Sequence, residues 1–318
     1  MGLPVTVYRY TDAGAPQLTS GTPSEWIAIL KACLVDGYGA KAGLGWTLEF
    51  ENAGQYKAAF RNSVVDGGTG GYVQFWSSTG GNAANTGMNF QTADSMSALD
   101  SFTKAGYGRQ LSLTTGMRGW EIIGTSRGFY IISHFTTNLL NGITTSSVQI
   151  NQHYFIGDIE SHLSNDQGVF TIVSTLATQS NQYSTSSTGI VNNTQSLYCR
   201  LYAADGGTSS FMYSASKMVS VGSASLDGNA ESLGLNHVMT PLVVTGANST
   251  SDVNGVLQNN SLVMPYCRGI IPGLYISTFA GYRNENWPTE LTRNEVQWVL
   301  LRSYFYTGYW VKTGTWYD

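Results

Sequence analysis

The sequence predicts an α+β protein that is predominantly β, with antiparallel sheets arranged as a sandwich or barrel, one clear N-terminal helix and one short helix. Short stretches of alternating apolar and polar residues recur along the chain, as in half-buried strands. Glycine-rich connections separate these stretches, and 37 of the 318 residues are glycine. The three-and-four spacing of a buried helical face occurs only in the first third of the chain. These observations together favour sheets over helices.

The clear helix is expected to begin after Thr22. Thr22 and Glu25 have the spacing of a capping box, with Pro23 at the first helical position. Gly37 is a natural left-handed stop after the last turn. The apolar residues that define one buried face are Trp26, Ile27, Leu30, Cys33 and Leu34. This pattern predicts a helix that packs one side against a core.

The short helix is expected over Ser95 to Lys104, with Met96, Leu99 and Phe102 on one side. Beyond about residue 105 the chain has the pattern of strands and loops. We therefore divide it into an α+β portion, residues 1–105, and a β-rich portion, residues 106–318, which could share one core.

The expected strands share an alternating pattern or a short apolar run bounded by turn residues. Two of them, Trp46–Phe50 and Tyr72–Phe75, lie on either side of the turn-rich segment Asp66–Gly71. One hairpin is expected to join Trp120–Ile123 to Phe129–Ile132, and another to join Val296–Tyr306 to Tyr309–Tyr317. The stretches Gln179–Gln195 and Thr245–Asn260, rich in Ser, Thr and Asn, are expected to be surface loops.

Composition excludes several classes of protein. The 16 Lys and Arg residues face 20 Asp and Glu residues, so a direct nucleic-acid partner is not expected. No apolar run approaches the roughly 18–20 residues of a membrane span, and the first residues lack the pattern of a secretory signal. The 3 cysteines form no CxxC pair, so neither a disulfide framework nor a zinc site is indicated. We expect folding in a cytoplasmic environment.

The scarcity of charge has a further consequence for the surface. Charged residues make up 11% of the chain, whereas a free domain of this size has a surface that is about 25–35% charged. Aromatic residues reach 12%, and protein interfaces are depleted in charge and enriched in aromatics. The composition therefore favours a protein that works in contact with other protein. The alternative is a neutral β-protein that acts alone.

The densest polar cluster runs from His153 to His162. If this segment is a strand, Asp158, Glu160 and His162 project from one face, where they could hold a divalent metal or pair a base with an acid. The alternative is that they line the solvated side of a strand whose other face is buried. Because no second cluster completes a site, we assign no catalytic, cofactor-binding or metal-binding residue and keep these three as the only candidates.

Further segments resemble known catalytic or phosphate-binding motifs, but each lacks the structural context or the residues that the motif requires. Gly124-Thr125-Ser126-Arg127-Gly128 fits G-x-S-x-G, but the following residues continue as a strand, so a hairpin turn explains the glycines better than a nucleophile elbow. The clusters Gly67–Gly71 and Asp205–Gly207 lack the Lys-Ser/Thr of a phosphate loop. We therefore expect a protein that is not an enzyme and has no cofactor.

Several segments spread along the chain together resemble a group of virion structural proteins of tailed bacteriophages. They are Val5–Tyr8, Asp12–Leu18, Ile29–Gly39, Gly45-Trp46, Trp120–Tyr130, Phe155–Ile159 and Arg268–Tyr275. The resemblance indicates a group of proteins and not a particular reaction, and it implies no catalytic residue. It also implies that Asp158 belongs to a strand that recurs in this group of proteins.

The resemblance implies a non-enzymatic structural subunit that folds in the bacterial cytoplasm and is then built into the virion. Its partners would be copies of itself, in a symmetric homo-oligomer of the tail or head–tail region, and other virion proteins. A capsid-decoration protein is one alternative. The other is an adhesin of the virion that binds a host-surface glycan or receptor.

Overall fold

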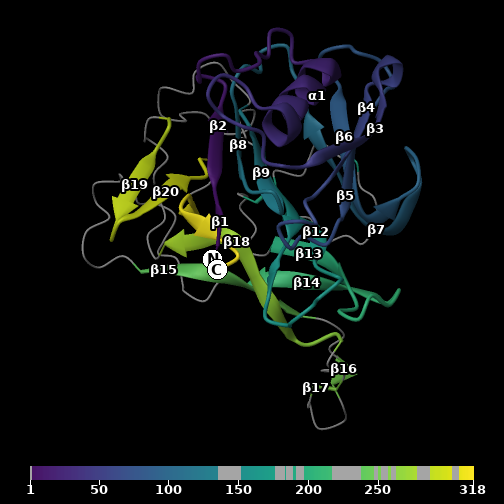
Figure 1. Ribbon diagram of the computed structural model, residues 1–318, viewed down its shortest axis with the longest axis vertical. Coiled ribbons are helices and arrows are strands. Elements are labelled where there is room, and N and C mark those ends of the chain that lie inside the picture. The colour runs from purple at the N-terminus through teal and green to yellow at the C-terminus, as the bar shows by residue number, and fades with distance from the viewer. Residues whose placement is uncertain are drawn as a thin grey trace.

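The computed structural model describes residues 2–134, 152–175, 183, 189–190, 197–216, 238–246, 250–251, 257–258, 263–277, 287–302 and 308–318. Within these residues, antiparallel strands form two five-stranded sheets, one eight-stranded sheet and two two-stranded sheets (Figure 1). No helix in this part of the chain has the length and apolar character needed to cross a membrane. The expectation of a predominantly β, sandwich-like fold with antiparallel sheets is confirmed.

The first sheet is a meander in which each strand pairs with the next along the chain. Its strands are β3 (Thr47–Asn52), β4 (Lys57–Arg61), β5 (Tyr72–Ser77), β6 (Gly87–Met96) and β7 (Phe102–Ser112), in that order. A 3₁₀ turn (Ala53–Gln55) connects β3 to β4. The strands expected at Trp46–Phe50 and Tyr72–Phe75 are thus confirmed, as is the turn-rich segment between them.

The helix α1 (Pro23–Lys31) packs on the first sheet and continues into a π-helical turn, Ala32–Asp36 (Figure 1). The carboxylate of Glu25 accepts a hydrogen bond from the backbone N–H of Thr22 at 3.0 Å, as the capping box requires. Gly37 ends the helix at φ 79°, and its N–H donates to the carbonyl of Ala32 at 2.8 Å. The predicted start, buried face and end of this helix are all confirmed.

The prediction of a short helix over Ser95 to Lys104 is wrong. β6 runs on to Met96, and β7 begins at Phe102, so the segment is a hairpin. Asp100 adopts a left-handed φ of 63°, and its N–H donates to Gln74 Oε1 at 2.7 Å. The apolar residues still share one small cluster, because a tight turn brings the ends of two strands over the same patch. The three-residue spacing of these apolar residues therefore comes from the ends of two paired strands and not from one face of a helix.

The central sheet contains the most deeply buried strands. Its strand order is β12 (Phe170–Val173), β10 (Gln152–Asp158), β9 (Gly128–Ser133), β8 (Trp120–Gly124) and β2 (Thr6–Arg9). The predicted hairpin around Gly124–Gly128 is confirmed by the pairing of β8 with β9. Along β10, Tyr154 and Ile156 belong to the core shared with the first sheet and α1, whereas Phe155 belongs to the core shared with the third sheet. The central sheet is therefore covered on both faces.

The third sheet completes the stack. Its strands, in order, are β13 (Leu197–Tyr202), β14 (Ser210–Ser216), β15 (Met239–Gly246), β18 (Cys267–Ser277), β21 (Tyr309–Lys312), β20 (Val296–Leu300) and β19 (Glu290–Arg293), with β11 (Glu160–Ser161) paired to β18. The two small sheets pair β1 (Leu3–Pro4) with β22 (Thr315–Trp316) and β16 (Thr250–Ser251) with β17 (Leu257–Gln258). The first pairing brings both ends of the chain side by side, as Figure 1 shows.

The remaining expectations concern boundaries. The pairing of β20 with β21 confirms a hairpin between the segments expected at Val296–Tyr306 and Tyr309–Tyr317, whose turn lies outside the described residues. Most of Gln179–Gln195 and of Thr245–Asn260 also lies outside them. Residue 105, where we divided the chain, falls inside β7, and one hydrophobic core contains residues from both sides of it.

Candidate functional site

The segment between β4 and β5 forms a protruding loop, which we call the anchored loop (Asn62–Gly71). Its turn is closed by hydrogen bonds from the N–H of Gly67 to Val64 O at 3.2 Å and from the N–H of Gly68 to Ser63 O at 2.9 Å. Gly67 sits at φ 79°, a conformation that favours glycine. Val65 at the tip is 91% exposed. The loop therefore gains little from apolar burial, and its shape depends on contacts at its base.

Those contacts converge on Asp158, which is fully buried at the end of β10. Its carboxylate accepts hydrogen bonds from Thr69 Oγ1 at 2.6 Å, from the Thr69 N–H at 3.0 Å and from Asn62 Nδ2 at 3.1 Å. Burial raises the pKa of Asp158, although the Thr69 donors and the charge of Arg127 oppose that effect. The alternation along β10 that directs Tyr154 toward the first sheet also directs Asp158 there. This buried carboxylate is the base of the anchored loop.

Two more side chains close this base. Arg127 Nε lies 3.5 Å from Asp158 Oδ2, and the guanidinium lies 4.0 Å from the centre of the Tyr317 ring. The hydroxyl of Tyr317 donates to the backbone carbonyl of Asp158 at 2.6 Å. The turn of the β8–β9 hairpin and the segment after β22 therefore help to fix the same point.

The three candidate residues of the sequence do not form one group. The chain leaves the central sheet after Asp158, and Glu160 pairs with Ile270 of β18 in the third sheet. Asp158 is buried, Glu160 is half-buried and His162 is exposed, with its Nδ1 3.6 Å from Cys267 Sγ. Because the strand is interrupted at Ile159, the expected single face does not exist. Among the described residues, no cluster of three or more His, Cys, Asp or Glu has a geometry that could hold a metal ion.

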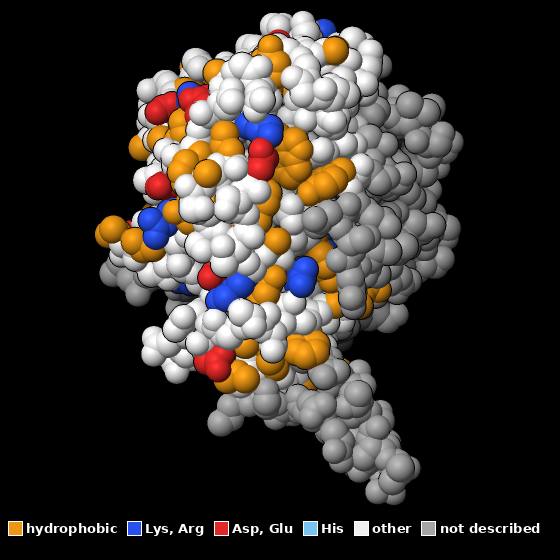
Figure 2. All heavy atoms as spheres, turned by 90° about the vertical axis from the view of Figure 1, so that its right-hand side faces the viewer, with side chains coloured by type: hydrophobic (Ala, Val, Ile, Leu, Met, Phe, Trp, Pro, Cys, Tyr) orange, Lys and Arg blue, Asp and Glu red, His pale blue; other side chains and the backbone are white. Residues whose placement is uncertain are grey.

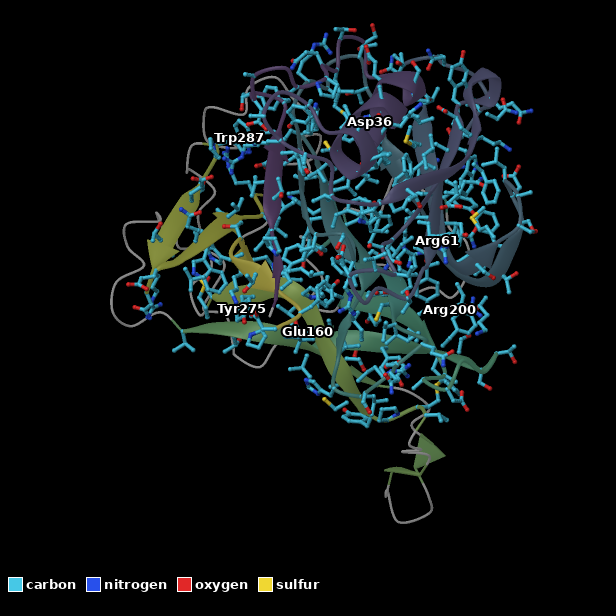
Figure 3. All side chains as sticks on the ribbon, in the orientation of Figure 1. Asp36, Arg61, Glu160, Arg200, Tyr275 and Trp287 are labelled. Atoms are coloured by element: carbon cyan, nitrogen blue, oxygen red, sulfur yellow. The ribbon has the colours of Figure 1, made fainter. Side chains whose placement is uncertain are left out.

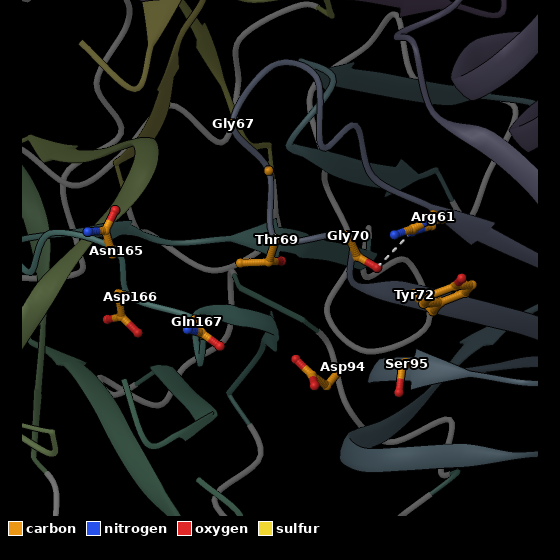
Figure 4. A pocket seen from close by; sticks show the side chains of 11 residues that line it. Arg61, Gly67, Thr69, Gly70, Tyr72, Asp94, Ser95, Asn165, Asp166 and Gln167 are labelled. Carbon is orange, nitrogen blue, oxygen red and sulfur yellow. Dashed lines mark hydrogen bonds between the residues drawn. The ribbon is translucent and has the colours of Figure 1, made fainter. Parts of the chain in front are cut away.

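Two polar cavities flank the anchored loop. The first, which we call the Arg61 cavity, has a volume of about 720 Å³ (Figure 4). Its lining comprises Arg61, Gly67, Gly68, Thr69, Gly70, Tyr72, Asp94, Ser95, Asn165, Asp166 and Gln167. The second, the Glu160 cavity, has a volume of about 310 Å³ and shares four of these residues. Figure 3 shows the labelled Arg61 on the side of the first sheet and Glu160 near β18 of the third sheet. Residues from two layers of the fold therefore line the two cavities.

The walls of the Arg61 cavity are held by buried contacts. Opposite the anchored loop, Asp166 is paired with the fully buried Arg268, with Nε–Oδ2 and Nη2–Oδ1 distances of 2.5 and 2.7 Å. Asp94 on β6 lies 3.3 Å from Lys104 Nζ. Both acidic groups of the cavity are therefore neutralised by cations.

The Glu160 cavity has a different charge. Burial raises the pKa of Glu160, and the nearby carboxylate of Asp318 adds to that effect. Arg127 supplies a positive charge on the wall next to the anchored loop. Sequence patterns did not indicate either cavity, because the walls come from segments that lie far apart in the chain.

A third polar cluster lies on the opposite face of the central sheet. Glu121 is 2% exposed and contacts Arg9 Nε at 2.9 Å, Trp287 Nε1 at 2.9 Å and His134 Nε2 at 3.3 Å. Burial opposes ionisation, but these contacts outweigh it and lower the pKa of Glu121 to about 2. His153 is also fully buried, which lowers its pKa to about 3. Glu121, His134, His153 and Trp287 are buried and Arg9 is half-buried, so we treat the cluster as structural.

The G-x-S-x-G match is a hairpin turn. Thr125 donates its N–H to Gly128 O at 2.9 Å, and the Thr125 carbonyl accepts from Trp46 Nε1 at 3.0 Å. β9 follows directly, where a nucleophile elbow would have a helix.

The sequence matches no model of a known protein family and no curated protein.

Proposed function

We propose that the chain is a non-enzymatic structural subunit of a tailed-phage virion, which assembles through neutral surfaces into a symmetric tail or head–tail structure. The observation that carries this proposal is how the few charges are used. Lys31, Lys41, Lys57, Lys104 and Lys312 each lie within 4.0 Å of a carboxylate. Other charged groups, such as Glu121, Asp158, Arg109 and Arg268, are buried. These paired and buried groups contribute little to the repulsion that keeps neighbouring molecules apart.

Figure 2 illustrates this on one face of the molecule. Isolated blue and red side chains stand among neutral polar and hydrophobic atoms, and no extended area of one charge is visible there. Covering such a surface with other protein costs less desolvation free energy than covering charged groups would. Together with the distributed resemblance in the sequence, this supports a working state in contact with neighbouring subunits.

The aromatic residues support the proposal less than their number suggests. Trp26, Trp120, Trp310 and Trp316 are buried in the cores. Among the described residues, Val64, Val65, Val238 and Tyr266 are the exposed large hydrophobics. In the part of the chain that the structure describes, the proposed interfaces are therefore polar and neutral rather than aromatic.

Immunogold labelling of purified particles tests the proposal. An antibody raised against the chain should label intact particles at a fixed position, and antibody pre-absorbed with the purified protein should not. Label on the tail or neck supports the proposed location, whereas label spread over the head favours the capsid-decoration alternative. Labelling of the lysate without any labelling of particles would remove the structural role.

A further inference from the structure

The Arg61 cavity contains an arginine that is fixed in place without an acidic partner. Arg61 is the last residue of β4, and its Nε donates to the carbonyl of Gly70 at 3.2 Å. Its guanidinium lies 5.5 Å from the centre of the Tyr72 ring, which itself stacks on Phe50. Among the residues that the structure describes, no carboxylate lies within 4.0 Å of Arg61.

The surroundings of Arg61 leave room for its guanidinium. Gly70 adopts φ 79°, and a Cβ at that position would come within 2.9 Å of Arg61 Nη2. Glycine at position 70 therefore permits both the turn of the loop and the close approach of the arginine. Figure 4 shows the guanidinium directed to this carbonyl at the cavity wall. A guanidinium held in this way presents its remaining N–H groups at little entropic cost.

The rest of the lining is polar and locally neutral. Ser95, Asn165 and Gln167 offer hydroxyl and amide groups that can both donate and accept hydrogen bonds, whereas the Thr69 hydroxyl, which donates to Asp158, can only accept. The carboxylates of the cavity are paired with cations, as described above, so the charge of Arg61 is the one left uncompensated. The volume of about 720 Å³ lies within the roughly 300–1,000 Å³ typical of small-molecule sites.

We propose that the Arg61 cavity binds a saccharide that carries a carboxylate. Arg61 receives the carboxylate through paired N–H···O hydrogen bonds, the arrangement that a planar guanidinium favours. The amides and hydroxyls of Asn165, Gln167 and Ser95 match sugar hydroxyls, which also donate and accept. An acidic peptide fits less well, because the only apolar side chain of the lining, Tyr72, is 8% exposed and offers no pocket for a peptide side chain. This inference goes beyond the structural role and does not depend on it.

Titration calorimetry with the purified full chain tests the inference. The probes are a trisaccharide of galacturonic acid and sialyllactose, each compared with its carboxyl-reduced counterpart. We expect at least one acidic probe to bind saturably and its neutral counterpart to bind at least tenfold more weakly. If neither acidic probe binds, or if the neutral counterparts bind equally well, the proposal is wrong. A triglutamate peptide that binds as tightly as the acidic saccharide would overturn the assignment to a sugar.

Variants locate the binding. Arg61→Gln should weaken binding of the acidic probe at least tenfold, whereas the matched charge change Arg118→Gln should not, because Arg118 donates to carbonyls of its own turn and lines neither cavity. Ser95 is exposed, so Ser95→Trp should fold normally and obstruct the cavity. Unchanged binding in both Arg61→Gln and Ser95→Trp would place the saccharide elsewhere and overturn the proposal.

Discussion

Replacement of Asp158 by alanine should release the anchored loop and destabilise the fold. The substitution removes a buried carboxylate that accepts three hydrogen bonds from Thr69 and Asn62. A hydrogen bond to a charged group contributes about 1.5–3 kcal/mol, and breaking a buried charged pair by deleting one partner costs about 3–5 kcal/mol. The desolvation that raises the pKa of Asp158 offsets part of this. We therefore expect a loss of about 3 kcal/mol in the free energy of unfolding.

The control is a carboxylate two residues away. Glu160 is half-buried, and both burial and the charge of Asp318 disfavour its ionised form. Its replacement by alanine should therefore cost less than about 1 kcal/mol. Urea unfolding followed by tryptophan fluorescence gives both values. Hydrogen exchange supplies a second measurement, because the Thr69 amide should exchange faster in Asp158→Ala than in Glu160→Ala. Equal costs for the two variants, with unchanged exchange at Thr69, would refute this account of the loop.

Two further predictions concern buried groups. Because the folded-state pKa of Glu121, about 2, lies below its usual value of 4.5, this carboxylate stabilises the fold above pH 4.5, and the contribution is lost as the pH falls toward 2. Urea unfolding at pH 7, 4 and 2 should show Glu121→Gln less stable at pH 7 but less sensitive to acid, with a difference of at most about 3 kcal/mol, whereas parallel pH profiles would contradict the assignment. Cys267 is exposed, whereas Cys33 and Cys199 are buried, so a thiol reagent should modify one cysteine in the folded protein and three in urea. Rapid modification of more than one in the folded state would contradict the packing.

The sequence predicted the local features of the fold well. Thr22, Glu25 and Gly37 act on groups within a few residues of themselves, so the bounds of the first helix follow from the chain alone. The hairpin around Gly124–Gly128 was predictable for the same reason. The failed helix at Ser95–Lys104 shows the limit of this reasoning, because a tight hairpin can reproduce the spacing of a short helical face.

The site was not predictable in the same way. Asp158 was singled out from its neighbours in the chain, but its partners Asn62 and Thr69 lie 96 and 89 residues away. The interruption at Ile159 sends Glu160 into another sheet, and no residue pattern marks that switch. Arg61 is the last residue of a short strand, and no residue pattern nearby in the sequence indicates a cavity. Such features depend on which layers of the fold meet, and that is decided by long-range packing.

The central claim is that a chain in which charged residues make up only 11% functions while partly covered by other protein. A density map of the purified particle tests this most directly. The account predicts that each copy of the chain contacts neighbouring subunits in a repeating arrangement, through areas poor in Lys, Arg, Asp and Glu. A map in which every copy is surrounded by solvent, or in which the particle contains no copy, would contradict it.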